Sequence, residues 1–183
     1  EVPLKMHQQH LDEIVLTKTG LPINGEPHLE PWLNFLHRMK NATKTVRIGL
    51  VGKYVELPDA YKSINESLFQ AATYNDRKLD LQYIHSEKLN SGNVDAMLSS
   101  LDGVLIAPGF GQRGIEGKFI ALKYAREHDI PTFGVCLGMQ CMVIEYARDV
   151  LGYTDANSTE MDVTTKHNVI DLMEEQKSIT NMG

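Results

Sequence analysis

Short apolar runs alternate with segments of helical spacing between residues 46 and 150. The apolar runs cover residues 46–51, 79–84, 103–107 and 131–135, and the sequence predicts helices at 61–75, 94–101, 117–127 and 137–150. Strands that alternate with helices in this way are typical of a parallel sheet covered by helices on both faces. The pattern therefore predicts an α/β fold of three layers, with one further strand at residues 168–173.

The first 43 residues have a different pattern. Two short amphipathic helices are predicted there, at residues 10–16 and 30–39, the second with Pro31 in its first turn. Neither helix can enclose a core by itself. We therefore interpret residues 1–43 as a linker between domains and residues 44–183 as part of the main domain.

Composition argues against several classes of protein. The 183 residues include 18 Lys and Arg against 24 Asp and Glu, a net charge of −6, without the basic excess of nucleic-acid-binding proteins. The longest apolar run, residues 103–108, is far shorter than the roughly 20 residues of a membrane helix, and the first residues lack a signal-peptide pattern. We expect a cytoplasmic protein that binds neither nucleic acid nor membrane. The spacing of Cys136 and Cys141 fits no zinc pattern, so no metal is expected.

The sequence GVCLGMQ at residues 134–140 places a cysteine between two glycines where a buried strand meets a helix. This is the spacing of a nucleophile elbow, with Cys136 in the place of the usual serine. The N-terminus of the following helix favours a thiolate, and the Leu137 N–H can stabilise an oxyanion. The alternative for any free cysteine is a small buried apolar residue, which is the interpretation we give Cys141.

A glycine-rich loop, PGFGQRG at residues 108–114, follows the third predicted strand. It contains G-x-G-x-x-G, but it does not follow the first strand, and the next helix is expected only at residue 117. We interpret it as a loop whose N–H groups face a substrate carbonyl. The P-loop-like segment GLVGKY at residues 49–54 lacks the required spacing and hydroxyl, and is given no role.

A cysteine nucleophile usually needs a histidine base oriented by a carboxylate. Two H-x-E triplets occur, at residues 28–30 and 85–87. His28 lies in the linker and is expected to be a surface residue. His85 follows the second predicted strand at the correct end of the sheet, yet nothing else marks it as the base.

Together these segments resemble class I glutamine amidotransferases, and more closely the glutaminase domains of CTP synthases. The matching stretches, in the same order, are GKYVELPDAYKS at 52–63, PGFGQRG at 108–114, GVCLGMQ at 134–140 and DANSTE at 155–160. The first and last are specific to CTP synthases. The resemblance covers essentially the whole chain, with residues 1–43 matching the interdomain linker. It implies a flavodoxin-like three-layer parallel-sheet sandwich that is incomplete at its C-terminus.

The resemblance also implies roles for individual residues. Cys136 would attack the glutamine carboxamide, form a glutamyl thioester and release ammonia, while Gly109 and Leu137 would donate N–H groups to the oxyanion. Glu160 would bind the substrate α-amino group, and Arg113 matches a region associated with activation by GTP. The residues implied to bind glutamine are Gly109, Phe110, Leu137, Gly138, Met139, Gln140 and Glu160.

Two departures from the family pattern stand out. The loop reads PGF at residues 108–110, one glycine shorter than the usual PGGF, which makes the oxyanion role of Gly109 less secure than that of Leu137. The family's H-x-E pair follows the cysteine near the end of the domain, whereas both triplets here precede Cys136. We therefore expect a linker plus the first part of a glutaminase domain, inactive by itself.

For the complete enzyme, the resemblance implies conversion of UTP to CTP with ammonia from glutamine. ATP and magnesium would bind a synthetase domain absent from this chain, GTP would be the activator, and the assembly would be a homotetramer. No cofactor is expected within residues 1–183. Two alternatives remain open: another cysteine hydrolase on the same fold with His85 as base, and a non-catalytic α/β module whose glycine loop binds a nucleotide.

Overall fold

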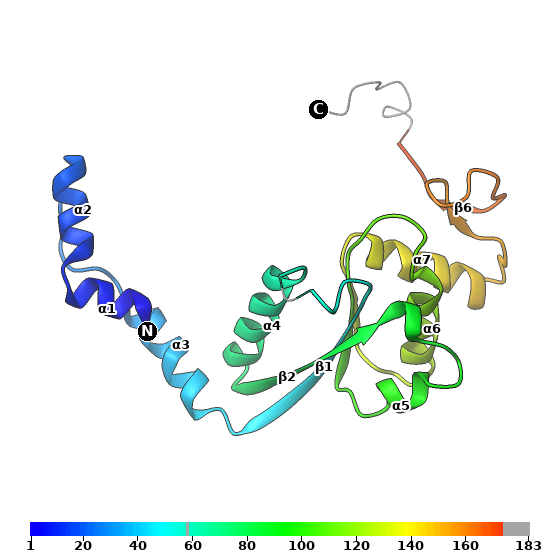
Figure 1. Cartoon of the computed structure of the whole chain (residues 1–183), viewed down its shortest axis with the longest axis horizontal. Coiled ribbons are helices and arrows are strands. Elements are labelled where there is room, and N and C mark those ends of the chain that lie inside the picture. The colour runs from blue at the N-terminus through cyan, green and yellow to red at the C-terminus, as the bar shows by residue number, and fades with distance from the viewer. Residues whose placement is uncertain (58, 174–183) are drawn as a thin grey trace. The chain divides into compact units, whose positions relative to one another are not determined.

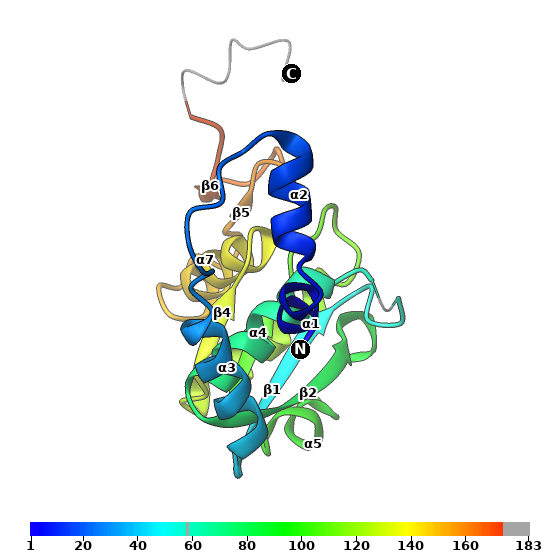
Figure 2. The same ribbon diagram turned by 90° about the vertical axis from the view of Figure 1, so that its left-hand side faces the viewer.

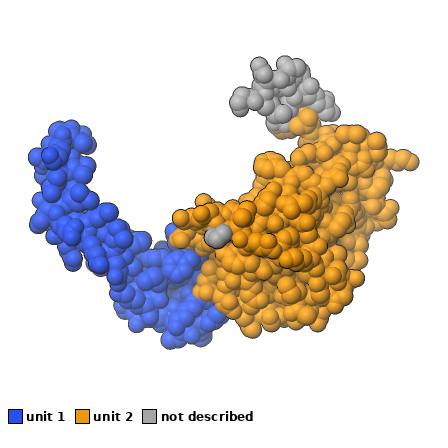
Figure 3. Space-filling model, viewed as in Figure 1, with its two compact units in different colours: residues 1–45, 69–78 blue, residues 46–68, 79–183 orange. Residues whose placement is uncertain are grey.

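The computed structural model describes residues 1–57 and 59–173. The chain divides into two compact units (Figure 3). The first contains residues 1–45 and 69–78, and the second contains residues 46–68 and the chain from residue 79 onward. The predicted division at residue 43 stays a prediction.

The first unit begins with three helices, α1 (Val2–Gln8), α2 (Leu11–Thr19) and α3 (Glu30–Asn41). The sequence analysis predicted only two, because seven residues are too few to show a clear apolar stripe in α1. Aromatic side chains join α3 to the other part of this unit. The Phe35 ring stacks on Trp32 at 5.3 Å between centroids and meets Phe69 edge-on at 6.2 Å.

A four-stranded sheet forms the centre of the fold (Figure 1). Its strands, β1 (Lys44–Gly52), β2 (Arg77–His85), β3 (Gly103–Ile106) and β4 (Thr132–Gly134), have the order β2-β1-β3-β4. β3 pairs in parallel with both β1 and β4, and Leu105 is in register with Leu50 and Phe133. This confirms the predicted parallel sheet, and the strand order is that of flavodoxin-like folds, where ligands bind at the carboxyl ends of β1 and β3.

Two apolar clusters lie on the two faces of this sheet. Tyr61, Ile64 and Leu68, from the segment that begins α4 (Lys62–Tyr74), pack on one face with Leu50. The neighbouring residue Val51 belongs to the other cluster, because successive strand residues point to opposite faces. That second cluster is built by α5 (Val94–Leu98), α6 (Ile115–Glu127) and α7 (Leu137–Asp149) (Figures 1 and 2). The three-layer prediction is confirmed.

Several local features differ from the predictions. A 3-10 turn, η1 (Ser86–Lys88), follows β2, and α6 begins at Ile115, two residues earlier than expected. The strand predicted at 168–173 is shorter, β6 (Asn168–Ile170), and it pairs with β5 (Asn157–Ser158) in a separate two-stranded sheet. Among the described residues, no helix is long and apolar enough to cross a membrane.

Candidate active site

Cys136 occupies the sharp turn between β4 and α7, with φ 52° and ψ −114°. A positive φ is costly for a residue with a side chain, and such strain persists where the surrounding structure imposes it, often at functional sites. The side chain is exposed, as the elbow prediction requires. The backbone of this turn therefore confirms the elbow geometry that the glycine spacing predicted.

The two flanking glycines are explained by close backbone contacts. A Cβ atom on Gly138 would lie 2.1 Å from the carbonyl oxygen of Ile106 at the end of β3. A Cβ atom on Gly134 would lie 2.5 Å from the backbone nitrogen of Met139. Real Cβ atoms do not come this close to backbone, so α7 can begin against β3 and β4 only if both positions lack a side chain.

One backbone N–H group in the first turn of α7, next to Cys136, has no hydrogen-bond partner among the described residues. The Gly138 N–H donates to the carbonyl of Val135 at 2.8 Å, and the Gln140 N–H donates to Cys136 at 3.1 Å. The Leu137 N–H, by contrast, makes no hydrogen bond within residues 1–57 and 59–173. A helix N-terminus carries partial positive charge, so a free donor here is suited to stabilise an oxyanion.

The glycine loop lies next to this turn. A Cβ atom on Gly109 would lie 3.7 Å from Cδ2 of Leu137, so the structure brings together the two residues predicted to form the oxyanion hole. The Gly109 N–H has no hydrogen-bond partner in the described part of the chain. The Phe110 side chain is 80% exposed. The structure thus places Gly109 next to Leu137, the residue that follows Cys136.

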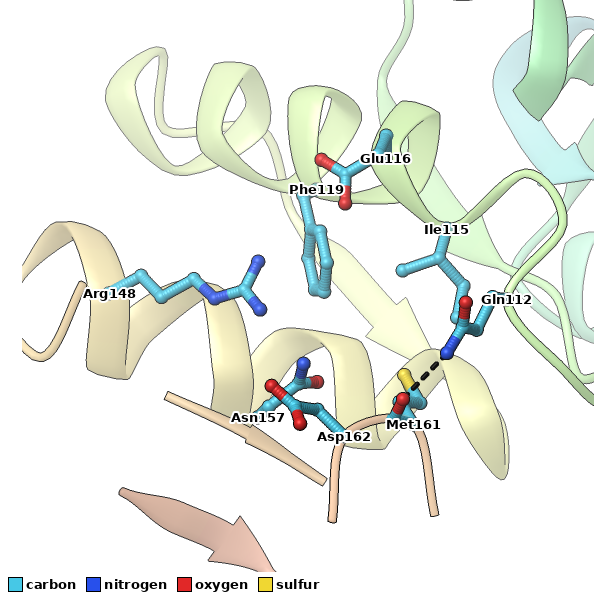
Figure 4. A pocket seen from close by; sticks show the side chains of 8 residues that line it. All are labelled: Gln112, Ile115, Glu116, Phe119, Arg148, Asn157, Met161 and Asp162. Atoms are coloured by element: carbon cyan, nitrogen blue, oxygen red, sulfur yellow. Dashed lines mark hydrogen bonds between the residues drawn. The ribbon is translucent and has the colours of Figure 1, made fainter. Parts of the chain in front are cut away.

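Gln112 joins the glycine loop to the segment that carries Glu160. Its Nε2 donates to the carbonyl of Met161 at 2.6 Å (Figure 4). The neighbouring residue Glu160 is exposed, and its N–H donates to Oγ of Ser158. The sequence analysis missed this role of Gln112, because nothing in the spacing links residues 49 positions apart.

The other predicted residues of the α7 turn have distinct surroundings. The Gln140 Oε1 atom is buried and has no hydrogen-bond partner among the described residues, whereas Met139 is 49% exposed. Cys141 is fully buried, and burial raises the pKa of its thiol to about 11, so it is not a reactive thiolate at neutral pH. The interpretation of Cys141 as a core residue is confirmed.

Arg113 makes an ion pair with Glu87, with Nη1 and Oε1 2.9 Å apart, and its guanidinium lies 5.4 Å from the centre of the Tyr54 ring.

His85 caps the short η1 turn, with Nδ1 accepting the Glu87 N–H at 3.3 Å. His28 is 81% exposed and hydrogen-bonds Glu30. Within residues 1–57 and 59–173, no histidine hydrogen-bonds the Cys136 thiol.

A cavity of about 430 Å³ lies between α6, α7 and the β5 segment (Figure 4). Its lining includes Gln112, Phe119, Arg148, Asn157 and Asp162. The Arg148 guanidinium lies 4.6 Å from the centre of the Phe119 ring, and its Nε donates to a backbone carbonyl of the β5 segment. No cluster of three or more His, Cys, Asp or Glu that could hold a metal occurs in the described part of the chain.

Comparison with known proteins identifies a family that this chain matches. A profile of class-I glutamine amidotransferases matches residues 56–182. CTP synthases of Bacteroides fragilis and Porphyromonas gingivalis are 68% and 61% identical over all 183 residues, and the chain spans 34% of the length of each. These relatives confirm the predicted resemblance.

A solved structure agrees with this assignment. The glutaminase domain of a Trypanosoma brucei CTP synthase, with bound acivicin, is 40% identical, with a TM-score of 0.67. The match covers 72% of this chain and 52% of that one. The profile match extends over most of the chain and includes the elbow and the glycine loop. The chain therefore belongs to the class-I glutamine amidotransferase family.

Proposed function

We propose that this chain binds L-glutamine and carries the cysteine nucleophile that releases ammonia from it. The observation that carries the proposal is Cys136 at a strained elbow with a free Leu137 N–H beside it. Family membership supports the substrate, as does the acivicin bound to the related trypanosomal domain.

The chemistry would proceed in two steps. The Cys136 thiolate attacks the carboxamide carbon, a C–S bond forms, and the carbonyl oxygen becomes an oxyanion held by the N–H groups of Leu137 and Gly109. The C–N bond then breaks, and the nitrogen leaves as ammonia after gaining a proton. Water cleaves the glutamyl thioester to glutamate and restores the thiol. The family's histidine would supply the proton transfers.

The substrate contacts are proposed from the residues around this turn. The buried, unpartnered Gln140 Oε1 is an acceptor suited to a substrate N–H group. Gly138 would not donate to the substrate, since its N–H already donates to the Val135 carbonyl. Its role would be to let α7 begin close to β3. Glu160, beside the Met161 carbonyl that Gln112 holds, would bind the α-amino group. Phe110 and Met139, both exposed, would contact the rest of the substrate, and Arg113 would belong to a GTP-responsive loop.

In the whole protein, we propose that the ammonia is used for ATP-dependent conversion of UTP to CTP. The names of the relatives support this proposal. The chain spans 34% of their length, so most of each relative lies outside the matched part. A synthetase domain in the same chain would bind ATP, magnesium and UTP. GTP as activator, a homotetrameric assembly and a cytoplasmic location belong to the same proposal.

The test is mechanism-based labelling followed by intact-protein mass. The chain is treated with acivicin or 6-diazo-5-oxo-norleucine, and Cys136→Ala and Cys141→Ala serve as matched variants. We expect one adduct on the unmodified chain and on Cys141→Ala, and none on Cys136→Ala. Labelling of Cys136 by a general thiol reagent but by neither glutamine analogue would refute the glutamine site.

The same experiment separates the two alternatives. A hydrolase that uses His85 as its base would lose labelling in His85→Ala, which we do not expect because His85 caps η1 instead. A nucleotide-binding module would bind nucleotide equally well with Cys136→Ala and would take up no glutamine analogue.

A further inference from the structure

Two lysine side chains are buried at the carboxyl edge of the sheet. Lys118, in the first turn of α6, is 1% exposed, and Lys53, directly after β1, is 7% exposed. Lysine is almost never this deeply buried without a partner, because an ammonium group loses its hydration there. The ion pairs of the described residues involve other cations, and no carboxylate lies within 4.0 Å of either group.

Both ammonium groups hold the glycine loop by its backbone. Lys118 Nζ donates to the carbonyl of Ala107 at 2.7 Å, and Lys53 Nζ donates to the carbonyl of Phe110. The two carbonyls lie on either side of Gly109. The donors come from different elements, so the backbone is held on both sides of Gly109 from two directions.

Gly109 lies directly against these lysines. A Cβ atom on Gly109 would be 3.4 Å from Cε of Lys53 and 4.0 Å from Nζ of Lys118. The same position is 3.7 Å from Cδ2 of Leu137, the residue after Cys136. The lysines, the glycine loop and the start of α7 thus form one packed group.

The surroundings of Lys118 change the pKa of its ammonium group. Burial lowers the pKa of Lys118 and is the largest effect, Cys141 raises it, Lys53 lowers it further, and Cys136 raises it. Burial raises the pKa of Cys141, Lys118 and Arg148 lower it, and Glu116 raises it.

We propose that Lys118, assisted by Lys53, is a positioning residue for the candidate oxyanion site beside Cys136: through the carbonyls of Ala107 and Phe110, the two lysines fix the backbone on both sides of Gly109. This gives Lys53 a function that the P-loop-like spacing around it did not suggest. The expected effect on labelling by a glutamine analogue rests on the proposed function, while the fixing of the backbone around Gly109 does not.

The test compares four substitutions at two lysines of the same helix. Lys118→Met removes charge and donor, Lys118→Gln keeps a donor without the charge, and Lys118→Arg keeps both. Lys123→Met is the matched control, because Lys123 also lies on α6 but is exposed and pairs with Asp149. Each variant is labelled with 6-diazo-5-oxo-norleucine and, separately, with iodoacetamide, and the rate at Cys136 is followed by peptide mass. Hydrogen exchange is measured at residues 109–111.

We expect hydrogen exchange at residues 109–111 to become faster in Lys118→Met, because the Ala107 carbonyl loses its donor. Labelling of Cys136 by 6-diazo-5-oxo-norleucine should slow severalfold in this variant, while labelling by iodoacetamide stays the same. Lys118→Gln and Lys118→Arg keep a donor and should restore much of the rate, and Lys123→Met should match the unmodified chain.

Cys141 reports whether each variant is folded, since this buried thiol is labelled only on unfolding. If Lys118→Met exposes Cys141, Lys53→Met replaces it, with the same changes expected. Unchanged hydrogen exchange and unchanged labelling in folded Lys118 and Lys53 variants would overturn the proposal. If hydrogen exchange becomes faster but no chain, the unmodified one included, reacts with the glutamine analogue, the positioning role stands and the glutamine function fails.

Discussion

Arg126 on α6 holds Glu145 on α7, with Nη2 and Oε1 2.7 Å apart and a second hydrogen bond from Nε at 3.1 Å. The Glu145 side chain is 4% exposed, so its charge depends on this partner.

Arg126→Met should lower the free energy of unfolding by about 2 kcal/mol, because it leaves a buried carboxylate unpaired. Urea denaturation measures this loss. Lys123→Met, which removes an exposed ion pair between the same helices, should cost clearly less, and an equal loss would contradict the argument.

Gly138→Ala should disrupt the elbow. Its new methyl group would meet the Ile106 carbonyl 2.1 Å away, and relieving that contact must displace α7 from β3. We expect a loss of stability of about 3 kcal/mol, at the upper end for overpacking, and loss of labelling by 6-diazo-5-oxo-norleucine. Gly92→Ala is the control, since it meets only the tip of a side chain at 3.2 Å. Normal labelling of Gly138→Ala would show that the elbow tolerates a side chain there.

Gln112→Leu should loosen the segment around Glu160. The substitution removes the hydrogen bond to the Met161 carbonyl but keeps similar volume. Hydrogen exchange at residues 159–163 should become faster, and labelling of Cys136 by the glutamine analogue should slow severalfold, while labelling by iodoacetamide stays the same. Unchanged exchange would mean that the bond does not hold this segment.

Asp155 should contribute stability that is lost in acid. Its hydrogen bond with His167 lowers the pKa of the carboxyl group below the usual 3.8, and the two side chains are 2.6 Å apart. A lowered pKa in the folded state gives stability that is present above pH 3.8 and is lost as the pH falls through the folded value. Asp155→Asn should therefore have a flatter dependence of melting temperature on pH below about 5 than the unmodified chain. Parallel curves would contradict this role.

The elbow and the sheet could be predicted from sequence because their constraints are local. Glycines on both sides of Cys136 are required by backbone contacts, and alternating apolar runs follow from strands buried on both faces. The strand predicted at residues 168–173 corresponds to β6, but β5 and its pairing with β6 could not be predicted, since a strand of two residues shows no periodicity.

The buried lysines were missed for a different reason. Lys118 follows Gly117 at the start of an amphipathic helix, where a lysine is normally exposed. Its ammonium group donates to the Ala107 carbonyl, 11 residues earlier and directly after β3. Such a contact exists only after β3 and α6 have packed, so no pattern in the sequence carries it.

The most direct test of the central claim, that Cys136 lies in a glutamine site, is protection of its thiol. The rate of Cys136 alkylation by iodoacetamide is measured with L-glutamine, with D-glutamine and without ligand. We predict that L-glutamine slows the reaction with a saturable dependence on concentration and that D-glutamine does so much less. An alkylation rate that L-glutamine leaves unchanged at saturating concentration would contradict the account.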